Sequence, residues 1–223
     1  DGDGYRLGVI DSAGNLIFPD RQMMLYAQDI LSRKPGGEII YDVKCTRNLP
    51  EIIKQAGGQP TMWKTGHSFI KQKLKATEGA LLAGEMSGHI FFKERWYGFD
   101  DALYTAARLL EIVAKENRPT AEIFGELPDT INTPELNVQF AEGAHYAFME
   151  QLKKQAQFGG AEVTLIDGIR ADYPHGWGLV RPSNTTPVLV FRFEAESQEA
   201  LEQVQDAFRK EVLNVQSDLS LPF

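Results

Sequence analysis

The sequence predicts an α/β domain with βαβ units and a mixed sheet, followed by an α+β domain with a largely antiparallel sheet. Three observations support this prediction. Residues 38–63 have the pattern of strand, helix and strand at the spacing of a βαβ unit. Proline and polar residues interrupt the periodic pattern between residues 118 and 134, which marks a domain boundary. Beyond it, short successive strands lie between two helical patterns, as in antiparallel sheets flanked by helices.

Composition restricts the class of protein. The chain has 223 residues, enough for one large domain or for two of about 100 residues each. With 43% hydrophobic and 24% charged residues it has a globular composition, and no apolar run approaches the ~20 residues of a membrane helix. We therefore expect no membrane partner, and a net charge of −8 argues against a nucleic acid partner. The single Cys45 excludes an intramolecular disulfide and suits a cytoplasmic location.

The elements of the first domain follow one another in order. The chain begins at Asp1-Gly-Asp-Gly4 without Met or an apolar leader, so we expect a fragment whose first strand lies near Val9. Asp20 is expected to cap one helix and Thr46 another, which Gly57-Gly58 ends. The other elements predicted here are strands at residues 38–43, 60–63, near 81 and 90–92, and helices at residues 68–75 and 101–115.

The second domain is expected to start near residue 129, where the turn-rich segment gives way to a strand pattern. Neither an internal repeat nor a low-complexity segment is found. The predicted elements are strands at residues 136–140, 162–166, 169–173, 178–181 and 188–193, and helices at residues 144–157 and 197–212.

The first candidate site is the acidic turn at the start of the chain. Asp1 and Asp3 lie two residues apart, and the intervening glycines let the backbone curl so that both carboxylates face one hard cation such as magnesium. The alternative is a β-turn whose aspartates bond to their own backbone. Two carboxylates alone hold magnesium weakly, so further ligands are needed.

Two further candidates follow predicted strands of the βαβ unit. Lys44 lies at the carboxyl end of one strand, where its ammonium can neutralise a phosphate or move a proton, or simply be solvated. Thr65-Gly66-His67 follows the next strand at the same edge of the sheet. His67 can therefore converge with Lys44, or it can be an ordinary loop histidine.

A row of polar residues follows the strand near residue 81. In an extended segment, Glu85, Ser87 and His89 emerge on one face, which suits bidentate binding of neighbouring sugar hydroxyls and lets the imidazole relay a proton. The alternative is a strand with one solvated face. Gly84 and Gly88 favour close approach of a ligand.

The last candidate is a loop between two predicted strands of the second domain. The run Arg181-Pro-Ser-Asn-Thr-Thr186 joins a guanidinium to hydroxyl and amide groups, without a carboxylate in the run. Guanidinium and neutral donors can cradle a phosphate, although a polar turn is the alternative.

Taken together, the chain resembles the C-terminal half of the α-D-phosphohexomutase family, of the bacterial phosphomannomutase/phosphoglucomutase type. The resemblance covers essentially all 223 residues. The matching stretches are Asp1 to Arg6, Lys44, Gly66-His67, Gly84 to His89, Phe99 to Asp101 and Asp172 to Thr186. Several motifs in the same order are far more specific than any one of them.

The resemblance implies the tail of a second domain at residues 1–14, a sugar-recognition domain at residues 15–128 and a phosphate-binding domain at residues 129–223. It implies a reversible conversion of mannose or glucose 1-phosphate to the 6-phosphate, by way of a phosphoserine and a hexose 1,6-bisphosphate. The phosphoserine belongs to the missing N-terminal half, so we expect the isolated chain to be inactive. The alternative is a non-catalytic module that binds phosphosugars.

The resemblance also implies a role for each matched residue. Asp1 and Asp3 match two of three magnesium ligands, and Arg6 follows that loop. Lys44, His67 and His89 match groups near the transferring phosphoryl or its acceptor, and the acid/base role stays open between Lys44 and His89. The sugar-hydroxyl readers are Glu85 and Ser87, and the loop that grips the other phosphate contains Arg181, Ser183, Asn184, Thr185 and Thr186.

The chain departs from the family pattern at Tyr5, where the family has a third aspartate. A phenol, with an ordinary pKa near 10, replaces an anionic ligand. We therefore expect magnesium in the intact enzyme of this type, and weak or absent magnesium binding in this chain.

Overall fold

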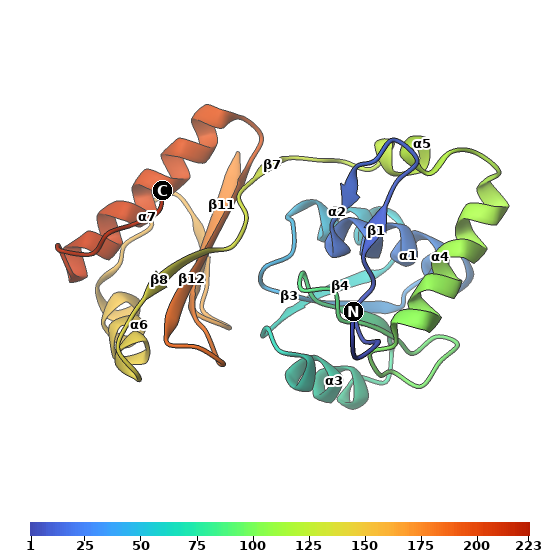
Figure 1. The fold of residues 1–223 in the computed structure, drawn as a ribbon, viewed down its shortest axis with the longest axis horizontal. Coiled ribbons are helices and arrows are strands. Elements are labelled where there is room, and N and C mark those ends of the chain that lie inside the picture. The colour runs from blue at the N-terminus through green and yellow to red at the C-terminus, as the bar shows by residue number, and fades with distance from the viewer. The chain divides into compact units, whose positions relative to one another are not determined.

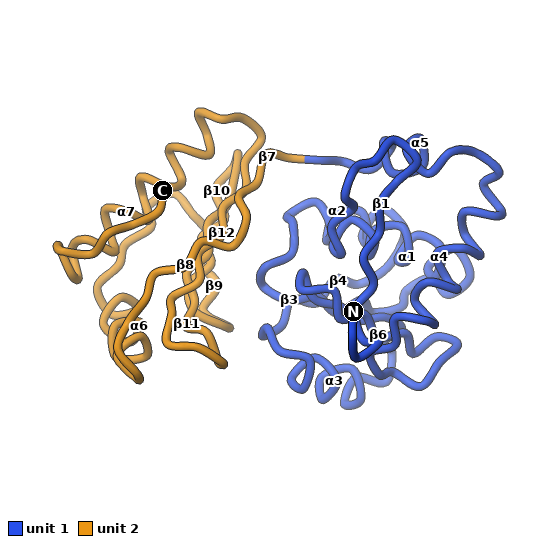
Figure 2. Tube along the Cα trace, in the orientation of Figure 1, with its two compact units in different colours: residues 1–129 blue, residues 130–223 orange.

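The computed structural model describes all 223 residues and divides them into two compact units, residues 1–129 and 130–223 (Figure 2). No helix is long and apolar enough to span a membrane.

Unit 1 is built on a four-stranded mixed sheet with the order β4-β3-β5-β6. The bounds are β3 (Glu38–Asp42), β4 (Gln59–Trp63), β5 (Ala80–Gly84) and β6 (Ile90–Phe92). Strand β3 is parallel to both β4 and β5, whereas β6 is antiparallel to β5. The helix α2 (Asn48–Gln55) joins β3 to β4, which confirms the predicted βαβ unit and mixed sheet.

Alternate side chains of this sheet enter two different cores, because successive strand residues point to opposite faces. Ile39 and Leu82 pack in a large apolar cluster with helices α1 (Pro19–Arg33), α2 and α4 (Ala102–Glu116). Ile40 and Ala83 pack instead with Ile70 of α3 (His67–Ala76). Figure 1 shows α3 on the opposite side of the sheet from α1 and α4. The sheet is therefore covered on both faces, and ligands have access at its edges.

The expected Asp20 cap of α1 is wrong, whereas Thr46 does accept a backbone hydrogen bond at the start of α2. Helix α1 begins at Pro19 with Phe18 as its N-cap, so Asp20 lies inside the first turn. The Asp20 carboxylate instead accepts a hydrogen bond from the Thr46 amide at 2.9 Å, which ties α1 to the loop after β3. Helix α2 begins two residues after Thr46, whose hydroxyl accepts from the Asn48 amide. Proline at the first helical position explains the early start of α1.

The remaining elements of unit 1 are short, and the sequence did not predict all of them. A two-residue hairpin pairs β1 (Val9–Ile10) with β2 (Leu16–Ile17), and α5 (Thr120–Gly125) follows α4. Neither β2 nor α5 has enough residues to show a clear periodicity.

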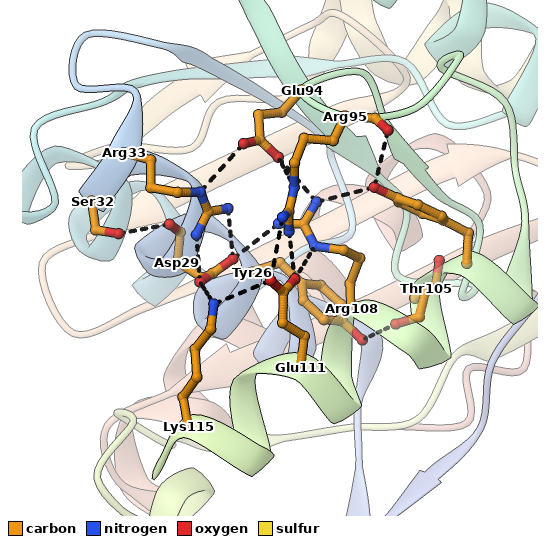
Figure 3. A network of polar contacts seen from close by, with 11 residues as sticks. Tyr26, Asp29, Ser32, Arg33, Glu94, Arg95, Thr105, Arg108, Glu111 and Lys115 are labelled. Atoms are coloured by element: carbon orange, nitrogen blue, oxygen red, sulfur yellow. Dashed lines mark hydrogen bonds and ion pairs between the residues drawn. The ribbon is translucent and has the colours of Figure 1, made fainter.

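A buried network of charged side chains joins α1 to α4 (Figure 3). The Arg108 guanidinium, with a side chain only 4% exposed, is 3.0 Å from Glu94 and 2.9 Å from Asp29. Arg33 also pairs with Asp29, and Glu111 also approaches Arg108. Each buried carboxylate thus faces at least one permanent cation, as buried charges require.

Unit 2 has a six-stranded antiparallel sheet, as the sequence predicted. The path is β7-β12-β11-β10-β9, and β8 also pairs with β12. The strands are β7 (Ile131–Asn132), β8 (Leu136–Gln139), β9 (Glu162–Thr164), β10 (Ile169–Tyr173), β11 (Gly176–Pro182) and β12 (Val188–Ala195). Helices α6 (Ala144–Gln155) and α7 (Gln198–Val215) lie on one face (Figure 1). Phe191 and Phe193 of β12 and Phe208 of α7 lie in the core between the sheet and the helices.

Candidate active site

Three loops of unit 1 leave the same edge of its sheet. Strands β3, β4 and β5 are parallel, so the segments after Asp42, Trp63 and Gly84 all start at their carboxyl ends. In an open α/β sheet this edge is where ligands usually bind. The loops carry Lys44, Thr65 to His67, and Glu85 to His89.

Asp42 connects these three loops, and sequence reasoning did not find it. Its side chain is fully buried at the end of β3. One carboxylate oxygen accepts from the Thr65 hydroxyl at 2.9 Å, and the other from the Met86 amide at 3.2 Å and the Cys45 thiol at 3.1 Å. The sequence signal that could have identified Asp42 is a charged residue directly after the apolar centre of a strand. Asp42 therefore holds the loops in register.

The expected extended row of Glu85, Ser87 and His89 is wrong. These residues form a tight turn between β5 and β6, in which the Gly88 amide donates to the Glu85 carbonyl and the Glu85 amide to the His89 carbonyl, both at 2.9 Å. Gly88 has a φ of 104°, which favours glycine. The side chains therefore do not line one strand face. Ser87 is exposed at the tip, while Glu85 is buried.

Glu85 ties this turn to the neighbouring loop. Its side chain is 1% exposed, and Oε1 accepts a hydrogen bond from the Gly66 amide at 2.5 Å. Gly66 has a φ of 130° and precedes His67, the first residue of α3. The Glu85 carboxylate thus fixes the segment that presents His67.

His89 and His67 lie together beside a carboxylate that was not singled out for a role. Their rings stack at 5.3 Å between centroids. The Asp100 carboxylate is 2.9 Å from His89 Nδ1 and 4.0 Å from His67 Nδ1, and it accepts from Lys71 at 3.0 Å. Burial lowers the pKa of His89, and the nearby Asp100 opposes that effect. Asp100 lies 11 residues after His89 in the sequence, and the fold brings the two side chains together.

The remaining predicted residues of unit 1 border the same region. Lys44 is buried with 5% exposure, which contradicts the solvated alternative. Arg6 forms an isolated backbone bridge with His89 and packs against Gly88. Arg6 and Ser87 line a cavity of about 440 Å³ together with Asp1. The acidic turn, the Ser87 turn and His89 are therefore neighbours.

The acidic turn does not fit magnesium. The Tyr5 and Arg6 amides donate to Asp1 Oδ1, and Arg6 Nε approaches Asp1 Oδ2 at 2.5 Å. Asp3 Oδ1 accepts from the Tyr5 amide at 3.3 Å. Magnesium requires a nearly octahedral set of oxygen ligands. Here the Arg6 guanidinium binds the Asp1 carboxylate, and the phenol of Tyr5 stands where the family has a third carboxylate. We therefore derive no chemical step through a metal ion.

In unit 2, Arg181 and Pro182 end β11, and Ser183 to Thr186 begin the turn that leads to β12. Arg181 is 5% exposed, and its Nε donates to Asp167 at 3.0 Å, so a carboxylate from the preceding loop holds the guanidinium. Its Nη2 atom is buried and has no hydrogen-bond partner. A buried donor of this kind is costly unless a ligand or water receives it.

The tip of this turn is organised around Ser183. Its Oγ lies within hydrogen-bond distance of the amides and hydroxyls of Thr185 and Thr186. Asn184, Thr185 and Thr186 are exposed, whereas Ser183 is buried. The turn therefore presents an amide and two hydroxyls on a base that Ser183 stabilises.

The fold and the site define a class of protein. It combines a βαβ-type domain, with cationic and imidazole groups at the carboxyl edge of its sheet, and an antiparallel domain with an Arg-Ser-Thr turn. The family model described as phosphoglucomutase/phosphomannomutase, alpha/beta/alpha domain III, matches residues 18–131. The model described as the C-terminal domain of the same proteins matches residues 135–211. The chain belongs to the phosphoglucomutase/phosphomannomutase family.

Individual relatives agree with this assignment. A phosphomannomutase/phosphoglucomutase of Pseudomonas syringae pv. tomato is 57% identical over all 223 residues, which span 48% of that protein. A phosphoglucomutase of Neisseria gonorrhoeae is 56% identical over 94% of this chain and 45% of its own length. The solved structure of a family protein from Burkholderia thailandensis has a TM-score of 0.94 and 55% identity, covering 100% of this chain and 47% of that one. The chain thus spans about half the length of these relatives.

Proposed function

We propose that this chain is the C-terminal half of an enzyme that reversibly converts mannose or glucose 1-phosphate to the 6-phosphate in the cytoplasm. A phosphoserine in the N-terminal half donates a phosphoryl group, and the hexose 1,6-bisphosphate that forms returns the other phosphoryl group. In this proposal residues 1–14 are the tail of a second domain, residues 15–128 recognise the sugar and residues 129–223 bind a phosphate. The name of the Pseudomonas syringae relative, of which this chain spans 48%, supports this reaction.

The observation that carries the proposal is the convergence of three loops at one sheet edge. Phosphoryl transfer depends mainly on positioning and on neutralisation of negative charge. Arg6, Lys44 and His89 supply cationic or protonatable groups around that edge. We assign the proton transfer to His89 because its Asp100 partner can stabilise the imidazolium that results.

The sugar contacts are assigned to the turn between β5 and β6. Ser87 is exposed at its tip and can bind a sugar hydroxyl directly. Glu85 contributes through the carboxylate that holds the Gly66 amide, with His67 presented beside it. This arrangement makes Glu85 as important for the shape of the site as for ligand contact.

The phosphate that is not transferred is assigned to the turn of unit 2. Thr185, Thr186 and Asn184 are its exposed donors, and Ser183 and Arg181 are buried beneath them. Arg181 offers its unpartnered Nη2 to the phosphate if the tip rearranges on binding. Partners of the complete enzyme are the hexose 1-phosphate, the hexose 6-phosphate and the bisphosphate.

A calorimetric titration of the 223-residue chain with glucose 1-phosphate tests the recognition part of the proposal. We expect binding that Thr185→Val weakens and that the matched change Thr164→Val, in β9 of the same unit, leaves unchanged. Free glucose serves as the ligand control. Equal binding by both variants would contradict the assignment of the phosphate to this turn.

A coupled mutase assay separates catalysis from recognition. We expect activity from the polypeptide that includes the N-terminal half, and none from the 223-residue chain, because the phosphoserine is missing from the latter. Turnover by the isolated chain would contradict that division. Binding without turnover in both forms would favour the second candidate function, a non-catalytic phosphosugar-binding module.

A further inference from the structure

Asp100 lies beside both histidines of this sheet edge, closer to His89 than to His67. The residue is 4% exposed and is fixed by an antiparallel backbone bridge to Phe91, two residues after His89. Its Oδ2 is 2.9 Å from His89 Nδ1, and its Oδ1 accepts from Lys71 Nζ at 3.0 Å. The two oxygens thus have different partners, an ammonium and an imidazole.

The contacts of Asp100 favour its ionised form. Burial is the largest single influence and raises the pKa of this carboxyl, but the hydrogen bonds from Lys71 and the backbone, with the charges of Lys71 and His89, together lower the net pKa. A carboxylate near neutral pH is an acceptor only, so the group facing it must donate. The facing atom is His89 Nδ1, which therefore carries hydrogen.

We propose that Asp100, held by Lys71, positions His89 and fixes the imidazole tautomer that has hydrogen on Nδ1 and leaves Nε2 as the proton acceptor. In a neutral imidazole one ring nitrogen donates and the other accepts, and the partner of the first selects which. His67 is the only competing imidazole beside Asp100, and its 4.0 Å separation is too long for a hydrogen bond.

The chemical purpose of this arrangement rests on the proposed function. As the sugar hydroxyl oxygen bonds to phosphorus, the serine oxygen–phosphorus bond breaks and its electron pair goes to the serine oxygen, which takes up a proton from water. The hydroxyl proton of the sugar passes to His89 Nε2. Asp100 then faces an imidazolium and stabilises it without taking its proton. Asp100 is a positioning residue, because its contacts are to His89 and Lys71 rather than to the sugar.

Both cationic and anionic groups surround His89, so removing one of them should shift the pKa of His89 in a defined direction. Arg6 and His67 disfavour the imidazolium, as burial does, and Asp100 is the carboxylate that favours it. Lys71 donates to the same Asp100 carboxylate. Loss of the Asp100 charge should therefore lower the His89 titration midpoint and release the Nδ1 tautomer.

Nitrogen-15 NMR of the histidine rings in the 223-residue chain tests the tautomer without any need for activity. We expect hydrogen on Nδ1 of His89 in the native chain, and a mixture or reversal of tautomers in Asp100→Asn, with a lower titration midpoint. The matched control is Asp101→Asn, the next residue, whose side chain caps α4 and accepts from the Tyr104 amide. Asparagine also caps helices well, so this control should keep the native His89 signals.

Lys71→Gln provides a second variant that leaves the carboxylate in place, and its parent side chain is 35% exposed. We expect the Nδ1 tautomer of His89 to persist in Lys71→Gln, with an upward shift of the His89 midpoint because the competing cation is gone. An Nε2-protonated His89 in the folded native chain, or unchanged His89 signals in folded Asp100→Asn, would overturn the proposal.

The catalytic consequence is measured separately in the polypeptide that includes the N-terminal half. Asp100→Asn should reduce kcat by at least about tenfold with a smaller change in KM, and should move the acidic limb of the pH profile. If His89 carries hydrogen on Nδ1 but the polypeptide with its N-terminal half has no mutase activity, the role of Asp100 would stand and the proposed reaction would be refuted.

Discussion

Unit 1 contains two clusters of carboxylates and cations that differ in one respect. Around Arg108, the carboxylates of Asp29, Glu94 and Glu111 face guanidinium groups that stay charged at all ordinary pH values (Figure 3). Around Asp100, the carboxylate faces one lysine and one imidazole. The first cluster has no member that titrates near neutral pH, whereas the second has His89.

The difference separates a structural cluster from a chemical one. Permanent charges with complete partners hold two helices together, but they cannot exchange a proton with a ligand near neutral pH. A histidine with one nitrogen fixed by a carboxylate keeps its second nitrogen for that exchange.

Arg108→Ala should break the structural cluster. The Glu94 side chain is 3% exposed and loses its buried cation, but Arg33 and Arg95 stay within 3.4 Å of it. Unit 1 should therefore be destabilised by less than the about 3–5 kcal/mol of a fully unpaired buried charge. Urea unfolding of the 223-residue chain measures the loss, and Arg118→Ala is the control, because Arg118 pairs with Glu126 at the surface. We expect a much smaller loss in the control. Similar losses in both variants would show that burial of the Arg108 network adds little.

His89→Gln should have the opposite profile, with a large effect on catalysis and a small one on stability. A general base contributes about 10²- to 10⁴-fold to the rate, so kcat of the polypeptide with its N-terminal half should fall within that range. His175→Gln is the control, because His175 pairs with Glu196 in the exposed part of unit 2. A kcat for His89→Gln equal to that of the control would transfer the acid/base role to Lys44.

The sequence predicted the elements better than the contacts between them. The βαβ unit and the five strands β8 to β12 of unit 2 were predicted because their apolar periodicity is local. The extended row at Glu85 was wrong because Gly88 reverses the chain there, and a glycine in a short polar run is compatible with both a turn and a strand.

The site was predictable only in part for the same reason. Lys44, His67 and His89 were selected from their places after strands and from the family resemblance. Asp42 and Asp100 act through partners 44 and 11 residues away in sequence, at Met86 and His89, so no local spacing reveals them. Asp20 was assigned to a cap because a carboxylate before an apolar helix usually caps it, but its partner is Thr46.

Tyr5→Asp tests the acidic turn at the start of unit 1, to which it adds a third carboxylate. We expect the affinity for magnesium to rise by roughly tenfold or more, since two unit charges about 4 Å apart interact by about 1 kcal/mol even in water and the cation carries two. Calorimetry with magnesium, and manganese electron paramagnetic resonance as a second readout, measure this gain. Tyr5→Phe is the control and should bind no better than the native chain. Strong magnesium binding by the native chain would contradict the poor fit of this turn.

Glu111→Gln should give the smallest effect and a characteristic dependence on pH. Hydrogen bonding from Arg95, together with Lys115, lowers the pKa of Glu111 from an ordinary 4.5 to about 2. A lowered carboxyl pKa contributes stability that is present above the unfolded value and is lost as pH falls toward the folded value. The native chain should therefore be more stable than the variant at about pH 7, by at most about 1 kcal/mol because the group is partly exposed. The two should converge between about pH 4.5 and pH 2.

Urea unfolding at several pH values measures this convergence, with Glu150→Gln on α6 as the control. The Glu150 side chain is 65% exposed and pairs with Lys153. Its replacement should therefore leave the pH dependence of the unfolding free energy nearly unchanged. A constant difference between native and Glu111→Gln chains across that range would mean that the Glu111 carboxylate does not contribute through its charge. The outer part of the Arg108 cluster would then be held by packing and the guanidinium stems rather than by ion pairing.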